Sequence, residues 1–130
     1  MIVVDASALV EVLLRTSLAP LVERRLFAAG ETLHAPHLLD VEVAQVLRRY
    51  AASGEIDATR GHAALEDLAD FPLRRYPHDV LLSRVWDLRN NVTACDAMYV
   101  ALAEALDAPL VTRDRRLAGA AGHQARIEVV

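Results

Sequence analysis

Short, continuous runs of apolar residues alternate along the chain with longer segments in which apolar residues recur at helical spacing. The first run, Ile2-Val3-Val4, ends at Asp5 and has the pattern of a strand buried on both faces of a parallel sheet. The clearest helical segment runs from Thr93 to Leu106, where apolar residues cover most of the predicted helix surface. Further strands are predicted over residues 32–35, 73–76, 110–112 and 127–130, and further helices over residues 6–14, 20–29, 36–53, 58–68 and 77–90.

This alternation predicts βαβ units, and therefore a three-layer α/β/α sandwich with a central, mostly parallel sheet. The length of 130 residues fits a single domain over 1–130, and no repeat or low-complexity linker divides the chain. In such sheets the functional crevice lies beyond the carboxyl ends of the strands. Asp5 and Asp114 follow two predicted strands, so we expect both acids at that edge.

The composition is typical of a folded globular chain rather than a disordered one, with 54% apolar and 25% charged residues. The single cysteine, Cys95, cannot form an intrachain disulfide, which favours a reducing compartment. Asp5 and Glu11 interrupt the first apolar run, so we expect folded structure there rather than a signal peptide. No stretch approaches the roughly 18 apolar residues of a membrane span. We therefore expect a cytoplasmic protein with no membrane partner.

The charge pattern allows two interpretations. A formal net charge of −4 argues against a nucleic-acid partner, because phosphate binding is driven by basic side chains that release counterions. All 14 basic residues are arginine, however, and several stand in adjacent pairs, so local positive patches could flank a negative site. The alternative is that these pairs are ordinary solvated helix faces.

Acidic residues stand at the predicted ends of strands and helices along the crevice edge. Asp5 and Asp114 each lie between a predicted strand and a predicted helix, where an aspartate often serves only as a helix N-cap. On these grounds alone, the capping role and a catalytic role explain either residue equally well.

Two further acids, Glu42 and Asp96, also have structural alternatives. Glu42 lies at the edge of an apolar helix stripe, where an unpaired carboxylate is costly, and Arg49 could pair with it. Asp96 stands three residues after Thr93, which fits a capping box as well as a functional carboxylate at the start of a helix.

The joint pattern points to chemistry, because four carboxylates gathered at one crevice repel one another. Hard cations such as Mg²⁺ or Mn²⁺ offset that repulsion, and Mg²⁺ usually takes only one or two carboxylates directly while keeping waters. We therefore expect direct ligation from Asp5 and Asp96, with Glu42 and Asp114 acting partly through water. Such an ion lowers the pKa of a bound water and neutralises charge on a scissile phosphate, which predicts phosphodiester hydrolysis without a covalent nucleophile.

The sequence lacks the residue patterns of other common catalytic mechanisms. Cys95 has no histidine at a recognisable motif spacing, no glycine-rich phosphate loop is present, and the five histidines form no zinc pattern. We expect His34 and His37 to be surface residues near a turn.

Three segments carry a resemblance to a known family: IVVDASALVE at the start, APHLLDVEVAQVLRR around Glu42, and NNVTACDAMYVALAEALDAPLVTRDRRLAG towards the end. Together they resemble the PIN-domain family, specifically VapC-type toxins of toxin–antitoxin pairs, and the match spans the whole chain. Residues 53–90 match only in their alternation of helix and strand. The resemblance implies a Mg²⁺- or Mn²⁺-dependent endoribonuclease that is usually dimeric and is held inactive by a cognate antitoxin. By motif position, the family's acids fall on Asp5, Glu42, Asp96 and Asp114.

The resemblance also suggests roles for residues beside the acids. The hydroxyls of Ser7 and Thr112 would support the first and last acids or contact the substrate. Arg113 and Arg115 flank Asp114 and could bind RNA phosphates bidentately, or could be ordinary surface charges. Cys95 departs from the family, because a bulkier, often aromatic residue is common at its position in similar toxins.

Two rival functions stay open. A phosphoryl-transfer or receiver-like domain would need a lysine, which this chain lacks, or a paired aspartate where it has Asp5-Ala6-Ser7. A catalytically silent PIN-like module that binds RNA or protein is the second rival, and the presence of all four acids argues against it. The apolar helix surface around Leu9, Leu13, Leu21 and Leu26 is expected to leave a face for a dimer or an antitoxin.

Overall fold

A five-stranded sheet in which every strand is parallel to its neighbours forms the centre of the computed structural model, which describes residues 1–130. The strand order is β3-β2-β1-β4-β5. The bounds are β1 (Ile2–Val4), β2 (Leu33–Pro36), β3 (Leu73–Tyr76), β4 (Leu110–Thr112) and β5 (Ile127–Val129). The parallel sheet confirms the predicted strand pattern, and all three residues of the central strand β1 are completely buried.

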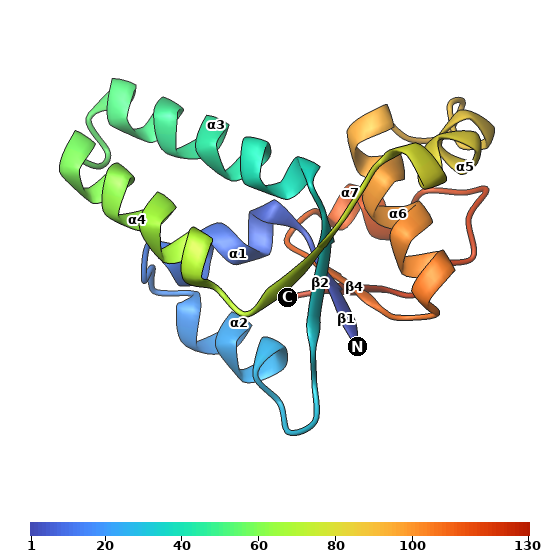
Figure 1. The fold of residues 1–130 in the computed structure, drawn as a ribbon, viewed down its shortest axis with the longest axis horizontal. Coiled ribbons are helices and arrows are strands. Elements are labelled where there is room, and N and C mark those ends of the chain that lie inside the picture. Colours follow the sequence, from blue (N-terminus) through green and yellow to red (C-terminus); the bar gives the residue numbers. More distant parts are fainter.

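Helices cover both faces of this sheet and so produce the predicted three layers. In Figure 1, α1 to α4 lie on one side of the strands, and α5 and α6 lie on the other. The helices are α1 (Ala6–Leu13), α2 (Ala19–Leu26), α3 (Leu38–Ser53), α4 (Ala58–Asp70), α5 (Leu82–Asp87), α6 (Ala94–Leu106) and α7 (Arg115–Ala118), with a 3₁₀ turn η1 (Asp79–Leu81) before α5. None of these helices is long and apolar enough to cross a membrane.

Helix α6 is the most deeply buried helix, as its apolar sequence predicts. Every residue from Ala97 to Ala103 is buried, and the helix packs on β1 and β2. Its two ends reach the surface, and the first turn carries Asp96.

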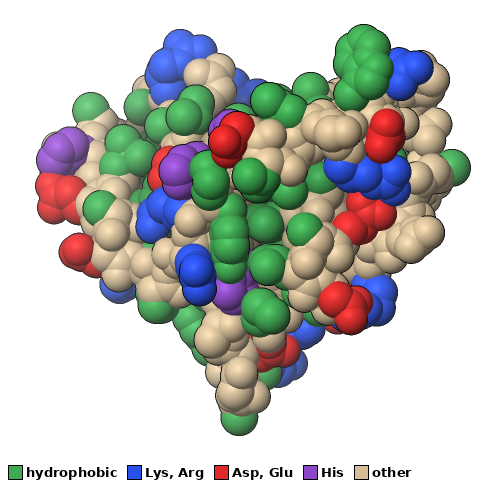
Figure 2. Space-filling view, turned by 45° about the vertical axis from the view of Figure 1, so that its right-hand side comes forward, with side chains coloured by type: hydrophobic (Ala, Val, Ile, Leu, Met, Phe, Trp, Pro, Cys, Tyr) green, Lys and Arg blue, Asp and Glu red, His purple; other side chains and the backbone are tan.

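The prediction of a free contact face around Leu9, Leu13, Leu21 and Leu26 is wrong. Leu9, Leu13 and Leu26 are at most 4% exposed, because they fill the space between α1, α2 and the sheet. Only Leu21 is exposed. Large apolar side chains instead reach solvent elsewhere, and Figure 2 shows such side chains interspersed with charged ones on one face of the molecule. The most exposed are Val41, Val80, Leu82 and Trp86.

Pro36 ends a strand rather than opening a helix, contrary to the prediction. It pairs with Tyr76 in the last register position of β2 and β3, and the His37 N–H donates to the Tyr76 carbonyl at 2.9 Å. The helix starts only at Leu38, whose N–H donates to His78 Nε2 at 2.8 Å. Parallel pairing with β3 thus delays the helix, and a histidine 40 residues away caps it.

The prediction of a single helix over residues 77–90 is also wrong. It divides into η1 and the short helix α5, and only Leu81 and Leu88 among its large apolar residues are buried. Val80 and Trp86 are 74% and 67% exposed. Few of its apolar side chains pack on the core, so the segment lacks the continuous apolar face of a long amphipathic helix.

His34 is buried in the sheet rather than exposed at a turn. It lies on β2, where one ring nitrogen bonds Thr32 Oγ1 at 2.8 Å and the other bonds the Tyr76 hydroxyl at 2.7 Å. His37 is exposed, as predicted.

Candidate active site at the carboxyl edge of the sheet

Asp5 directly follows the central strand, and its backbone N–H continues the sheet by donating to the Val111 carbonyl at 3.0 Å. It occupies the N-cap position of α1, but its side chain makes no capping bond. Instead, its Oδ2 accepts from Ser7 Oγ at 2.9 Å and from Thr112 Oγ1 at 2.6 Å. The side chain is therefore held by two hydroxyls, and its Oδ1 accepts no hydrogen bond from the protein.

The hydroxyls of Ser7 and Thr112 also connect the first acid to the loop after β4. The Arg113 N–H donates to Ser7 Oγ at 3.0 Å, and the Asp114 N–H donates to Thr112 Oγ1 at 3.0 Å. Thr112 is completely buried. Because these hydroxyls contact both loops, they fix the relative positions of Asp5 and the backbone of Asp114.

Glu42 projects from α3 and is bound by a residue that the sequence analysis treated only as core. The Tyr99 hydroxyl donates to Glu42 Oε1 at 2.6 Å, and no ion pair with Arg49 forms. Burial raises the pKa of Glu42 above its ordinary value; the Tyr99 bond opposes this rise, and repulsion from Asp5 and Asp96 adds to it.

Asp96 lies in the first turn of α6. The Thr93 hydroxyl accepts from the Asp96 N–H at 3.2 Å, but the return bond of a capping box does not form. Burial raises the pKa of Asp96, the Thr93 hydroxyl lowers it, and repulsion from Asp5 and Asp114 raises it further. The carboxylate is thus available for a role other than capping.

Asp114 does serve as a helix cap, as one of its two interpretations predicts. Its Oδ1 accepts from the Arg116 N–H at 2.9 Å, and the Arg116 guanidinium lies 3.4 Å from the same oxygen. Burial raises the pKa of Asp114, but these bonds from Arg116 outweigh it and hold the pKa below its ordinary value.

The fold therefore places the four acids on elements that meet at one edge, and their charges interact. Glu42 is repelled by Asp5 and Asp96, and Asp96 by Asp5 and Asp114. No three His, Cys, Asp or Glu side chains have the arrangement of a complete metal-ion site. The acids lie close enough for their charges to interact.

The arginines beside Asp114 differ from one another in their contacts. The Arg113 guanidinium donates to the Val130 carbonyl, and Arg115 is exposed and has no partner in the protein. Arg116, which the sequence analysis did not select, is the arginine that contacts Asp114.

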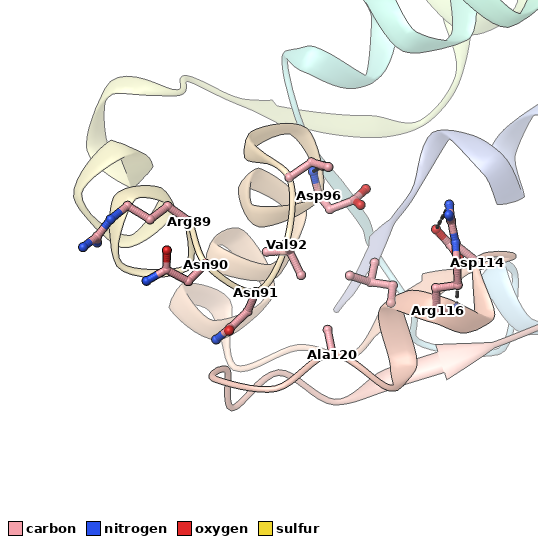
Figure 3. Close-up of a pocket in the computed structure, with 10 residues that line it drawn as sticks. Arg89, Asn90, Asn91, Val92, Asp96, Asp114, Arg116 and Ala120 are labelled. Atoms are coloured by element: carbon pink, nitrogen blue, oxygen red, sulfur yellow. Dashed lines mark hydrogen bonds and ion pairs between the residues drawn. The ribbon is translucent and has the colours of Figure 1, made fainter.

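An open cavity of about 460 Å³ borders this edge. Asp96, Asp114 and Arg116 line it, and in Figure 3 the Asp96 carboxylate points towards Asp114 and Arg116. Asn90 and Asn91 lie on the opposite side. The cavity therefore offers space for a ligand directly beside two of the four acids.

The profile of the family described as "PIN domain" matches residues 2–122. The chain belongs to the PIN-domain family. Within that family it is similar to "Ribonuclease VapC9" of Mycobacterium tuberculosis, at 47% identity over 130 residues, covering 100% of this chain and 98% of the relative. This likeness confirms the resemblance to VapC-type proteins.

Two solved structures share the fold. PAE2754 from Pyrobaculum aerophilum superposes with a TM-score of 0.70 at 27% identity, covering 99% of this chain and 83% of the other. A chain of a toxin–antitoxin complex from Klebsiella pneumoniae superposes with a TM-score of 0.65 at 19% identity, covering 92% of each chain. The fold of this chain is therefore shared with these solved structures over nearly its whole length.

Proposed function

We propose that this protein is a metal-dependent endoribonuclease, the toxin of a toxin–antitoxin pair, with Asp5, Glu42, Asp96 and Asp114 as its catalytic acids. The observation that carries the proposal is the convergence of these carboxylates, from four separate elements, on one edge of the sheet. Two of them, Glu42 and Asp96, have a raised pKa that reflects burial and mutual repulsion. Perturbed carboxylates beside an open cavity are typical of catalytic sites. The relative VapC9 is named a ribonuclease, which supports RNA as the substrate.

The donor set fits Mg²⁺, with Mn²⁺ as an alternative, because these ions prefer carboxylate and water oxygens. Mg²⁺ usually takes one or two protein carboxylates directly and fills the other positions with water. Asp5 and Asp96 are the proposed direct ligands. Asp5 Oδ1 has no hydrogen-bond partner in the protein, and the negative charge of Asp5 raises the pKa of Asp96. When bound, the ion supplies a water of lowered pKa and neutralises charge on the scissile phosphate.

The protein side chains supply orientation and charge. The hydroxyls of Ser7 and Thr112 hold one oxygen of Asp5, and the Tyr99 hydroxyl holds one oxygen of Glu42. Asp114 is held by Arg116, whose 93% exposed side chain can move to a substrate phosphate. Arg115, also exposed, is a second candidate for phosphate contact, whereas Arg113 is engaged by the Val130 carbonyl.

The proposed partners are a cognate antitoxin and a second copy of the chain, in the cytoplasm where cellular RNA is found. The similar fold in a toxin–antitoxin complex from Klebsiella pneumoniae supports an antitoxin partner. The exposed apolar side chains of Val41, Val80 and Trp86 supply surface for such contacts. Light scattering of the purified chain, giving twice the mass of one copy, would support the homodimer, and a mass of one copy would contradict it.

The test is cleavage of total cellular RNA by purified protein freed of any partner, with Mg²⁺, Mn²⁺ or EDTA. Discrete fragments are expected with either metal and not with EDTA. Asp5→Asn and Asp96→Asn should each abolish cleavage, whereas Asp107→Asn, which changes a 90% exposed carboxylate paired with Arg126, should not. Absence of cleavage by the unaltered protein under all conditions would favour the binding module over the enzyme.

A further inference from the structure

The outer face of α5 and of the turn that follows it presents a tryptophan and an arginine to solvent. Val85 and Leu88 pack against the core, and residues three positions apart lie on the same face of a helix. Trp86 and Arg89 therefore share the opposite face, and Trp86 is 67% exposed. Trp86 is the only tryptophan in the chain and the largest apolar side chain that the fold leaves uncovered.

The two exposed side chains form one unit. The Arg89 guanidinium lies over the Trp86 ring, 4.6 Å from its centroid, and Arg89 Nη1 donates to the Trp86 carbonyl at 2.9 Å. The attraction of the cation to the ring and this hydrogen bond together hold the guanidinium in place. Arg89 makes no ion pair with a carboxylate, so its positive charge is available to an anion.

This pair adjoins the cavity that holds two of the acids. Arg89 lines the cavity together with Asp96, Asp114 and Arg116. In Figure 3, Arg89 lies on the side opposite Asp114 and Arg116, and its guanidinium points outward, away from the acids. One continuous surface therefore runs from the acids through the cavity to Arg89 and Trp86.

We infer that an unpaired base of the RNA substrate stacks on Trp86 while Arg89 binds a phosphate of the same strand, at a nucleotide other than the one that is cut. The inference rests on the proposed function and extends its substrate site beyond the acids. An aromatic ring beside a cation suits single-stranded RNA, because every base has a face that stacks and every nucleotide carries a phosphate. Arg89 and Arg116 flank the cavity and supply local positive charge in a chain whose net charge is −4.

A protein partner is the competing occupant of this ring, so binding is measured on the ring itself. Because the chain has a single tryptophan, tryptophan fluorescence reports on Trp86 alone. A short single-stranded RNA, added in EDTA to prevent metal-dependent cleavage, should quench the emission in a saturable manner. An abasic strand with the same phosphates should not. No quenching, or equal quenching by both strands, would overturn the inference, as would an emission maximum that shifts when the protein alone is concentrated, because a second copy would then cover the ring.

The contribution of the ring to catalysis is tested by steady-state cleavage of a single-stranded RNA. Trp86→Ala should raise KM about tenfold and leave kcat unchanged, because the ring binds the substrate away from the reacting phosphate. Trp86→Phe keeps an aromatic face and should restore most of the affinity. Val80→Ala is the matched control, since it removes a 74% exposed apolar side chain from the neighbouring turn η1. An unchanged KM in Trp86→Ala would contradict the proposed role.

The charge of Arg89 is tested by the salt dependence of RNA binding. Arg89→Gln removes the charge, so the slope of log Kd against log salt concentration should fall by about 0.7, the contribution of one phosphate contact on a single strand. Arg126→Gln is the control, because Arg126 is an exposed arginine that is already paired with Asp107. The same slope in Arg89→Gln as in the unaltered protein would show that Arg89 contacts no phosphate.

The outcomes separate this inference from the proposed function. If the unaltered protein cleaves RNA and Trp86→Ala cleaves it with the same KM, the inference fails and the proposed function stands. If the protein cleaves no RNA at all, the proposed function fails, while the fluorescence titration still decides whether the ring binds a base.

Discussion

The hydroxyl of Tyr99 donates a hydrogen bond of 2.6 Å to Oε1 of Glu42, joining the buried centre of α6 to an acid on α3. Tyr99 is 1% exposed, so its hydroxyl has no access to solvent as an alternative partner. A donor to a carboxylate stabilises the charged form, which opposes the effect of burial on Glu42. Tyr99 is therefore a positioning residue that holds the Glu42 carboxylate and opposes the rise of its pKa.

Replacing Tyr99 with phenylalanine should lower the rate of RNA cleavage about tenfold, a barrier increase of roughly 1.4 kcal/mol. Without the donor, the pKa of Glu42 should rise further, so the acidic limb of the pH–rate profile should move to higher pH. A loss of packing alone would lower the rate equally at every pH and leave that limb unmoved. Tyr50→Phe on α3, whose hydroxyl makes no hydrogen bond, is the matched control.

Thr112→Val should disable Asp5 with little change in volume. The substitution removes the 2.6 Å bond to Asp5 Oδ2 and leaves the Asp114 N–H without its acceptor. A buried group left unsatisfied costs about 1–3 kcal/mol, so the free energy of unfolding in urea should fall by that amount, together with the cleavage rate. Thr112→Ser keeps the hydroxyl and should retain most of the activity, and an equal loss in both variants would contradict this role.

Asp96→Asn should stabilise the fold while it abolishes cleavage. The pKa of Asp96 is raised in the folded state, so its ionised form destabilises the fold, and this penalty appears as pH rises through the folded pKa. The melting temperature of the variant should exceed that of the unaltered protein near neutral pH, and the difference should vanish in acid. Added Mg²⁺ should raise the melting temperature of the unaltered protein but not of the variant. Equal stabilisation of both proteins by Mg²⁺ would remove Asp96 from the proposed ligands.

His34, which lies away from the acidic site, should make the melting temperature depend on pH. Burial lowers its pKa, and the positive charges of the N-terminal amine and Arg74 lower it further. Because the folded pKa lies below the unfolded value of about 6.5, the neutral ring stabilises the fold above that pH, and this stability is lost as pH falls through the folded pKa.

Between about pH 7.5 and about pH 5, the melting temperature of the unaltered protein should therefore fall further than that of His34→Asn. His62→Asn is the control, because His62 is an exposed histidine paired with Glu66 on α4. A pH dependence that persists unchanged in His34→Asn would show that other groups cause it.

The local sequence determined the strands and most helices of this protein. Leu73–Tyr76 and Leu110–Thr112 form strands with the predicted bounds, because a short apolar or alternating run between turn residues has few other stable conformations. The acids at strand and helix ends were also visible, since their positions follow from where those elements stop. Asp5 and Asp114 show why the sequence alone could not assign their roles: the two have the same local pattern, yet only Asp114 caps a helix with its side chain.

Tertiary structure decided the side-chain contacts and the strand pairing that join residues far apart in the chain. The Asp5 side chain accepts a hydrogen bond from Thr112, 107 residues away. Glu42 accepts one from Tyr99, 57 residues away, and forms no ion pair with the nearby Arg49. Pairing with β3 holds Pro36 in a strand, although its local pattern predicts a helix start. Local propensities are worth only fractions of a kcal/mol per residue, whereas sheet pairing and the burial of polar groups are worth several times more, so the long-range contacts prevail where the two conflict.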